Sequence, residues 1–190
     1  MKGGVRLNLL QRLKNKDEAA LIEMMNLYGD HLLRIAILLV KDRFVAEEVV
    51  QDTFVIAFQK IAQLNDAAKL KSWLIMIATN ECRRRMRKWS WKHIFLHKED
   101  SYEANIVDNS ELQPEQSLLV SFRDTQIHVC IQQLPYKYRE VVTLYYFQEL
   151  TIKEICDVIS EKENTVKTRL ARGRTQLKQL IEKGGEDLVK

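Results

Sequence analysis

Apolar residues recur every three or four positions along most of this chain, which is the spacing of one face of an α-helix. The pattern predicts a helix over about residues 17–40, a second over about 44–61 and a third over about 70–91. The third helix becomes strongly basic after Cys82. Amphipathic helices bury their apolar faces against one another, so we expect residues 1–92 to form one compact bundle.

Polar residues at the starts of the first two helices can cap them. Asn15 and Glu18 have the spacing of a capping box, in which two side chains satisfy free backbone N–H groups reciprocally. Asp42 can accept a hydrogen bond from the first turn of the second helix. These residues predict where the two helices begin.

The helical pattern stops between Glu99 and Phe122, where the chain has six acidic residues and no Lys or Arg. We predict an acidic linker over residues 93–117. The periodicity then resumes, so residues 118–190 should form a second helical unit. The predicted fold is therefore all-α, with two small helical domains joined by an acidic linker.

A helix-turn-helix is predicted in the second unit. Thr151 and Glu154 form a capping-box pair before a short amphipathic helix, and a further helix begins near Glu163 or Asn164. This last helix turns Val166 and Leu170 inward and presents polar and cationic side chains outward: Lys167, Thr168, Arg169, Arg172 and Arg174. A helix that reads DNA needs this division, because apolar residues hold it in place while Lys, Arg and Thr reach phosphates and base edges.

The alternative for this basic helix is an ordinary solvated surface. Two observations favour DNA reading: the preceding helix is short and capped, and residues 167–178 hold five cations and no acid.

The end of the third helix is also basic. Asn80, Arg84, Arg87 and Trp91 recur at spacings of four, three and four, so they share one helix face. Such a face can bind phosphates and stack an unpaired base, since stacking on an aromatic ring contributes about 1–3 kcal/mol per base. A polybasic helix end that interacts with the helix dipole is the alternative, and the spacing does not decide between them.

The second helix presents a different surface. Glu48, Gln51, Asp52 and Val55 lie on one outward face that mixes acids with an apolar side chain. DNA would be repelled by it, whereas a basic protein surface would be attracted. A protein-binding face and a plain solvated face both remain open.

The composition agrees with a helical globular protein. The chain is 46% hydrophobic and has only 6 Gly and 2 Pro. An all-β fold needs many tight turns and usually has more of these turn-forming residues. Its net charge of +4 permits a polyanionic partner without requiring one. No apolar run approaches the roughly 20 residues that cross a bilayer, and no secretory signal is present, so we expect a cytoplasmic protein. Cys82, Cys130 and Cys156 are predicted to be reduced, buried thiols.

Enzymatic activity is not expected. The chain has no Gly-rich phosphate loop, no H-E-x-x-H, no serine elbow and no C-x-x-C. His93 and His97 are four residues apart and follow Cys82, but two ligands without a matched second pair make a weak metal site. We therefore expect neither a metal nor a cofactor.

Four segments together resemble the extracytoplasmic-function sigma factors of bacteria. A-E-E-V-V-Q-D-T-F at 46–54 and K-S-W-L-I-M-I-A-T-N-E-C-R-R-R-M-R-K at 71–88 look like region two of that family. The segments at 131–155, which contain L-P-Y-K-Y-R-E, and at 165–174, T-V-K-T-R-L-A-R-G-R, look like region four. The resemblance implies a sigma factor that binds core RNA polymerase and directs it to promoters.

Site residues follow from this resemblance. The core polymerase-binding residues would be Glu48, Gln51, Asp52 and Val55. A base flipped from the minus-ten element would be captured by Asn80, the loop at 65–72 and a pocket beside Trp73, and the full set expected at this element is Lys69, Ser72, Trp73, Asn80, Arg84 and Arg87. The minus-thirty-five element would be read by Lys167, Thr168, Ala171, Arg172 and Arg174.

The partners implied by the resemblance are the clamp and flap regions of core RNA polymerase, promoter DNA and an anti-sigma factor, which can hold a sigma factor at the membrane. No membrane insertion of the chain itself is expected.

The chain departs from the family pattern in the turn of the helix-turn-helix. The family commonly has Gly where this chain has Ser160, an apolar residue at Glu161 and Gly at Asn164. Because Ser and Glu tolerate left-handed backbone geometry poorly, we expect an irregular or less stable turn. Ala171 is small at a base-contacting position, so Lys167 and Arg172 would carry more of the specificity.

Two other classes of protein remain as alternatives. A transcriptional regulator would bind operators through the same helix-turn-helix, but its first domain should offer a ligand pocket or a phospho-acceptor site. An adaptor or antagonist of polymerase would not need Lys167, Thr168 and Arg172 on one exposed helix face.

Overall fold

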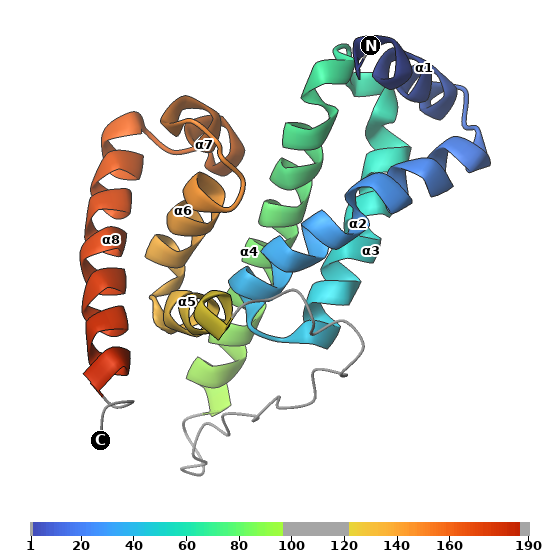
Figure 1. Cartoon of the computed structure of the whole chain (residues 1–190). Coiled ribbons are helices and arrows are strands. Elements are labelled where there is room, and N and C mark those ends of the chain that lie inside the picture. The colour runs from blue at the N-terminus through green and yellow to red at the C-terminus, as the bar shows by residue number, and fades with distance from the viewer. Residues whose placement is uncertain (1, 97–121, 187–190) are drawn as a thin grey trace.

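The computed structural model describes residues 2–96 and 122–186, with side chains described for 8–88 and 127–183. Over those residues the chain forms eight α-helices and two single-turn 3-10 helices, and no strand (Figure 1). The predicted all-α class is confirmed.

The first unit contains four α-helices, of which the first was not predicted from the sequence. Three leucines of that helix, Leu9, Leu10 and Leu13, are buried against the rest of the unit. The α-helices are α1 (Lys2–Lys14), α2 (Glu18–Val40), α3 (Arg43–Lys60) and α4 (Leu70–Leu96), and the 3-10 turns Ile61–Gln63 and Ala67–Lys69 connect α3 to α4.

One of the two predicted helix caps is wrong. The N-cap of α2 is Asp17, whose carboxylate accepts a hydrogen bond from the backbone N–H of Ala19 at 2.9 Å, so Asn15 and Glu18 do not form the expected box. Arg12 pairs with the same carboxylate at 2.8 Å, a contact that depends on the unpredicted α1. The cap on α3 is confirmed, because Asp42 accepts from the first turn as expected.

The second unit contains α5 (Phe122–Gln133), α6 (Tyr136–Tyr146), α7 (Ile152–Ile159) and α8 (Glu163–Glu186). The predicted capping box of Thr151 and Glu154 is present at the start of α7. Gly173 lets α8 approach α6 closely, because a Cβ at this position would lie 2.8 Å from the Val142 side chain. Helices α7 and α8 are therefore held as a helix-turn-helix against α6.

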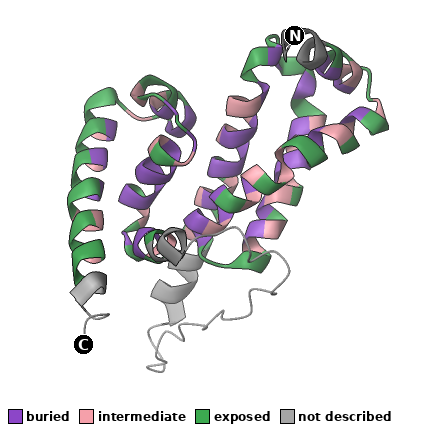
Figure 2. Cartoon of the chain, viewed as in Figure 1, coloured by how far each residue is buried: buried purple, intermediate pink, exposed green. Residues whose placement is uncertain are grey.

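The two units pack against each other. Helix α7 contacts α4, and α5 and α6 contact the C-terminal part of α2 (Figure 1). Buried side chains of both units, such as Leu39 and Leu74 in the first and Leu134 and Ile155 in the second, belong to one hydrophobic cluster. Buried positions occur on the helices of both units (purple in Figure 2).

An ion pair joins the units at the contact of α4 with α6 and α7. The guanidinium of Arg83 binds both carboxylate oxygens of Glu140, at 2.5 and 2.7 Å, and donates to the carbonyl of Ile159 at 2.8 Å. The Glu140 side chain is only 2% exposed. Burial by itself lowers the pKa of Arg83, but the hydrogen bond and charge of Glu140 outweigh it and raise that pKa.

The end of α2 is also bound by the second unit. The buried Arg139 donates to the carbonyl of Leu39 at 2.8 Å, and the amide of Gln132 donates to the carbonyl of Ile37 at 3.4 Å. The last carbonyls of a helix have no partner within the helix and carry its negative dipole end, so a cation there is stabilising. Each unit therefore donates hydrogen bonds to carbonyls at a helix end of the other: Arg83 to the end of α7, and Arg139 to the end of α2.

Most of the predicted linker, residues 93–117, lies outside the described residues, which exclude 97–121. Its first four residues belong to α4, which continues to Leu96. The three cysteines are free thiols, as expected, and Cys82 and Cys130 are buried. Cys156 was also predicted to be buried but is only half-buried. Among the helices described, none combines the length and the apolar character needed to span a membrane.

Candidate nucleic-acid and polymerase interfaces

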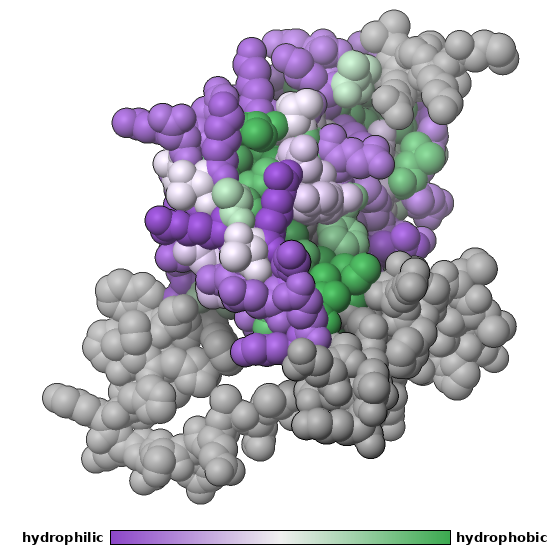
Figure 3. All heavy atoms as spheres, turned by 60° about the vertical axis from the view of Figure 1, so that its left-hand side comes forward, coloured by the Kyte–Doolittle hydropathy of each residue, from purple (hydrophilic) through white to green (hydrophobic). Residues whose placement is uncertain are grey.

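Helix α8 divides its residues largely as the sequence predicts, except that Arg169, expected on the outward face, is half-buried. Val166 and Leu170 are buried, at 0% and 3% exposure, and hold the helix against the unit. The outward residues Lys167, Thr168, Ala171, Arg172 and Arg174 are all exposed. The side of the molecule that carries α8 is mainly hydrophilic, as expected of a surface that meets DNA (Figure 3).

Several cations of this face already have partners in the free protein. Lys167 pairs with Glu163 one turn earlier at 2.6 Å, and Arg169 turns toward Glu161 at 2.7 Å. Arg174 stacks on the rings of Tyr145 and Tyr146, at 5.1 and 5.5 Å from their centroids. The structure therefore holds Arg174 on α6 aromatic residues, whereas the sequence placed it with the base-contacting set.

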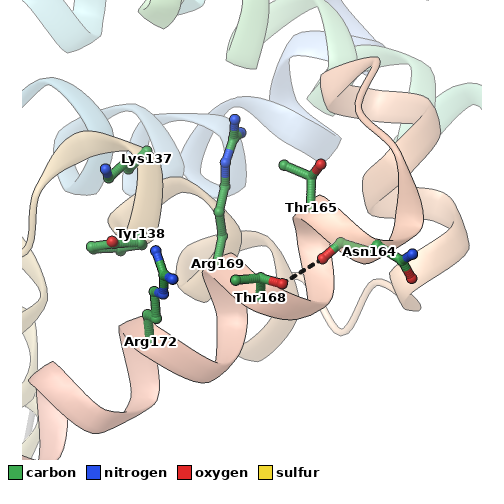
Figure 4. Close-up of a pocket in the computed structure, with 7 residues that line it drawn as sticks. All are labelled: Lys137, Tyr138, Asn164, Thr165, Thr168, Arg169 and Arg172. Carbon is green, nitrogen blue, oxygen red and sulfur yellow. Dashed lines mark hydrogen bonds between the residues drawn. The ribbon is translucent and has the colours of Figure 1, made fainter.

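A hollow of about 430 Å³ lies beside α8, between it and the start of α6 (Figure 4). Its wall from α6 is formed by Lys137 and Tyr138, two residues that no sequence pattern had indicated as part of a DNA-binding surface. A hydrogen bond from Arg172 lowers the pKa of Tyr138, and the charge of Lys137 acts in the same direction. The remaining lining residues come from α8: Asn164, Thr165, Thr168, Arg169 and Arg172.

The hollow widens the cationic surface of the helix-turn-helix beyond α8. Lys137 lies 34 positions before Ala171 in the sequence, so no local pattern could place it there. Only the close packing of α6 on α8 brings it beside Arg172.

The residues expected at the minus-ten element lie at the start and on the outward face of α4. Asn80 and Lys69 are exposed, and Trp73 is half-buried against the core. The Ser72 hydroxyl donates to the carbonyl of Lys69 at 3.0 Å. The segment 65–72, expected as a loop, is mostly helical, because a 3-10 turn spans Ala67–Lys69 and α4 begins at Leu70.

The cationic part of this face is exposed at Arg84 and Arg87. Trp91, expected on the same face, lies in α4, but its side chain is outside the described residues. Arg84 is paired with Glu81 on its own helix and with Asp52 of α3, the latter at 3.2 Å.

The acidic face of α3 is solvent-accessible as predicted. Glu48, Gln51 and Val55 are exposed and Asp52 is half-buried. Asp52 pairs with Arg85 at 2.7 Å, and Glu48 pairs with the same arginine. From the sequence, the acidic face of α3 and the basic face of α4 were predicted to be separate surfaces. In the structure, ion pairs join the two faces.

Metal binding has no support from the described side chains. No group of three or more His, Cys, Asp or Glu residues within 8–88 and 127–183 is placed to hold an ion. The side chains of His93 and His97 lie outside those ranges.

Comparison with known families identifies both units. Residues 24–92 match Sigma-70 region 2, and residues 124–177 match Sigma-70, region 4. A helical region 2 followed by a helix-turn-helix region 4 defines the sigma factors, regulatory proteins that direct RNA polymerase to promoters.

Relatives specify the kind of sigma factor. The chain is 30% identical over 165 residues to the ECF RNA polymerase sigma factor SigM of Bacillus subtilis, covering 87% of this chain and 97% of SigM. It is 28% identical over 177 residues to SigW of the same organism, covering 90% of this chain and 94% of SigW. The chain belongs to the extracytoplasmic-function (ECF) sigma factors. A stand-alone regulator with a sensor domain is not favoured, because the first unit matches region 2.

Solved structures share the fold. The sigma factor RpoE, solved in complex with the anti-sigma factor NepR from Bartonella quintana, superposes with a TM-score of 0.66 at 23% identity, covering 84% of this chain and 95% of RpoE. CnrH, solved in complex with the cytosolic domain of CnrY, gives a TM-score of 0.63 at 19% identity over 93% of this chain and 96% of CnrH.

Proposed function

We propose that this sigma factor reads the minus-thirty-five element with the outward face of α8. The observation that carries the proposal is the division of that helix: Val166 and Leu170 are buried while Lys167, Thr168, Ala171 and Arg172 are exposed. A good base contact in the major groove discriminates by about 1–3 kcal/mol. Lys137 and Arg174 flank this face and would bind the phosphate backbone, which adds affinity without sequence preference.

The minus-ten element is assigned to the face of α4 that begins at the 3-10 turn before it. Asn80 would bind a flipped base, and the half-buried Trp73 would form one side of its pocket. Lys69, Ser72, Arg84 and Arg87 surround this position with polar and cationic groups that suit the strand backbone.

Core polymerase is assigned to the acidic face of α3. Glu48, Gln51, Asp52 and Val55 combine exposed carboxylates with an exposed apolar side chain, which suits a basic protein surface such as the polymerase clamp. Region 4 would contact the flap of the enzyme. This assignment leaves the outward face of α8 accessible to DNA.

An anti-sigma factor is a further proposed partner, because one of the structures that share this fold contains a sigma factor bound to an anti-sigma factor. Such a partner would inhibit transcription in a purified system. The proposed location is the bacterial cytoplasm, where promoter DNA and polymerase are found, with an anti-sigma factor able to hold the chain at the membrane.

The proposed contacts are tested by run-off transcription with purified core polymerase on a genomic promoter library. Discrete start sites should appear only when the protein is added. Arg172→Ala should lower transcript yield roughly tenfold or more at promoters that depend on the upstream element, because a base contact is lost. Asn80→Ala should permit binding but block strand opening, detected by permanganate reactivity of unpaired thymines.

Lys178→Ala is the matched control, since Lys178 is exposed on the same helix as Arg172 and pairs only loosely with Glu182 at 3.7 Å. Its transcription should equal that of the wild type. Equal losses for Arg172→Ala and Lys178→Ala would contradict base reading by α8 and indicate a general charge effect.

A further inference from the structure

Helix α1 lies at the end of the first unit where the chain passes from α3 to α4 (Figure 1). We call residues 61–69 the α3–α4 connection; they contain both 3-10 turns, and α1 contacts each turn. The second turn belongs to the segment 65–72, which is expected to capture the flipped base of the minus-ten element. Helix α1 lies outside the region 2 match, which begins at residue 24. A helix outside the matched region therefore packs on a segment that is proposed to receive DNA.

The α3–α4 connection is anchored at every third residue. Ile61, Leu64 and Ala67 are buried, at 0%, 6% and 8% exposure, and the two residues after each of them are exposed. This spacing matches the three residues per turn of a 3-10 helix. The buried residues belong to the same hydrophobic cluster as the leucines of α1, and a close-packed interior allows them little displacement. The exposed residues are therefore held out to solvent by a backbone whose position depends on α1.

Lys16, in the turn between α1 and α2, fastens the start of this connection. Its ammonium donates to the backbone carbonyl of Phe58 and lies 4.5 Å from the centroid of the Phe58 ring. Phe58 is in the last turn of α3, where carbonyls have no partner within the helix and carry its negative dipole end. A cation at this carbonyl therefore stabilises the end of α3 just before the connection begins.

The turn that carries Lys16 is held on both sides. The Lys16 N–H donates to the carbonyl of Leu13 at 3.0 Å, which closes α1. Arg12 of α1 pairs with Asp17 at 2.8 Å and with Glu23 of α2 at 2.7 Å. Lys16 has a φ of 61°, a left-handed conformation that Gly adopts without the steric penalty of a Cβ. The lysine side chain is therefore present at a conformational cost, and it supplies the contact with the end of α3.

We propose that Lys16 is a positioning residue for base capture: through the end of α3 it holds the α3–α4 connection where the flipped base is received. This inference rests on the proposed function and extends it to a residue 64 positions before Asn80. Lys16 acts through the protein backbone and does not bind the DNA. Arg84 and Arg87, proposed to hold the strand backbone, lie on α4 and take no part in this contact. Loss of Lys16 should therefore weaken recognition of the captured base and leave binding of the strand backbone unchanged.

The test measures binding of holoenzyme to a fluorescent single-stranded oligonucleotide that carries the minus-ten element of a promoter mapped by run-off transcription. Each base of the element is replaced in turn by an abasic site, and the position that weakens wild-type binding most marks the captured base. Loss of that base should weaken wild-type binding roughly tenfold, because its stacking and hydrogen bonds are removed. The ratio of the affinity for the intact strand to that for the abasic strand is the base preference.

Lys16→Ala and Lys16→Gly both remove the contact with Phe58 and should reduce the base preference to roughly threefold or less. Their binding of the abasic strand should equal that of the wild type. The two variants differ in stability, because Gly relieves the strain of the positive φ and Ala keeps it. An equal fall in base preference, despite unequal unfolding midpoints in denaturant, separates positioning from a general loss of stability.

Lys14→Ala is the matched control, because it removes the same charge two positions earlier and leaves the contact between Lys16 and Phe58 in place. Its base preference should equal that of the wild type. The same fall in base preference in Lys14→Ala would show that charge near α1, and not the contact with α3, sets the preference.

Three other results would overturn the inference. An unchanged base preference in both Lys16 variants would show that the contact does not position the connection. An equal loss of affinity for intact and abasic strands would show that Lys16 binds phosphates directly, and a fall confined to Lys16→Ala would indicate a stability effect. If no abasic site weakens binding of wild-type holoenzyme, the proposed minus-ten base contacts fail, and this inference fails with them.

Discussion

Cys82 lies on α4 where the second unit covers it, and it is fully buried. Burial raises the pKa of Cys82 to about 12, and the carboxylate of Glu140 adds to the effect. The thiol is therefore protonated at neutral pH. Its contribution to stability is complete below the ordinary pKa of 9.0 and is lost as the pH rises toward about 12, because the unfolded chain ionises first.

A variant that keeps only Cys82 should react with Ellman's reagent at pH 8 at least about a thousandfold more slowly when folded than when unfolded. The reason is that the thiolate fraction falls tenfold for each unit of pKa between 9.0 and about 12. A variant that keeps only the half-exposed Cys156 is the control and should react without denaturant. Similar rates for folded and unfolded Cys82 would contradict its burial.

At the scale of the element, the turn between α7 and α8 carries identifiable strain. Ser160 has a φ of 53°, in the left-handed region, and its N–H donates to the carbonyl of Cys156 to end α7. An irregular or less stable turn is expected here because the family commonly has Gly where this chain has Ser160. The structure locates that difficulty at Ser160 and shows that α7 still ends with a complete hydrogen bond.

Ser160→Gly should stabilise the protein by about 0.5–1 kcal/mol, because Gly adopts positive φ without the steric penalty of a Cβ. The gain is a difference between relief of strain and the greater backbone entropy of Gly in the unfolded chain. Denaturant unfolding followed by circular dichroism measures it. Ser160→Ala is the control and should show no gain, and a Gly variant less stable than wild type would contradict the strain.

At the scale of the whole molecule, the two proposed DNA-reading faces are too close together to bind one promoter. Helix α4 contacts α7 and α7 contacts α8, so at 8–10 Å per helix pair the axes of α4 and α8 lie within roughly 20 Å of each other where the units pack. Elements 25 base pairs apart are separated by about 85 Å of straight duplex. The units must therefore separate before both elements are bound.

Arg83→Ala should favour that separation. It removes the bidentate pair with Glu140 and leaves a buried carboxylate with little compensation, at a cost of about 2–4 kcal/mol. Small-angle X-ray scattering should show a larger radius of gyration, and Cys82 should become reactive as its cover leaves. Arg43→Ala removes an exposed pair with Glu47 and should change neither quantity. An unchanged radius for Arg83→Ala would show that this ion pair does not hold the units together.

Local signals in the sequence determined most of the helices. Asp42, Thr151 and the apolar spacing around Val166 place helix starts and buried faces correctly, because caps and periodicity act over a few residues. Helix α1 was not predicted because its three buried leucines lie in a short segment where the apolar residues do not recur with a clear helical spacing. The cap of α2 was misplaced for a related reason, since Asp17 is held by Arg12 of that helix.

The sequence by itself thus determined the all-α fold, the helix-turn-helix and the exposed face of α8, since each depends on residues close together in the chain. Tertiary structure alone decided which charges meet. Asp52 lies 33 positions from Arg85, Arg83 lies 57 positions from Glu140, and Lys137 lies 35 positions from Arg172. Helix packing sets these distances, and an ion pair acts only over a few ångströms, so no spacing along the chain could reveal it.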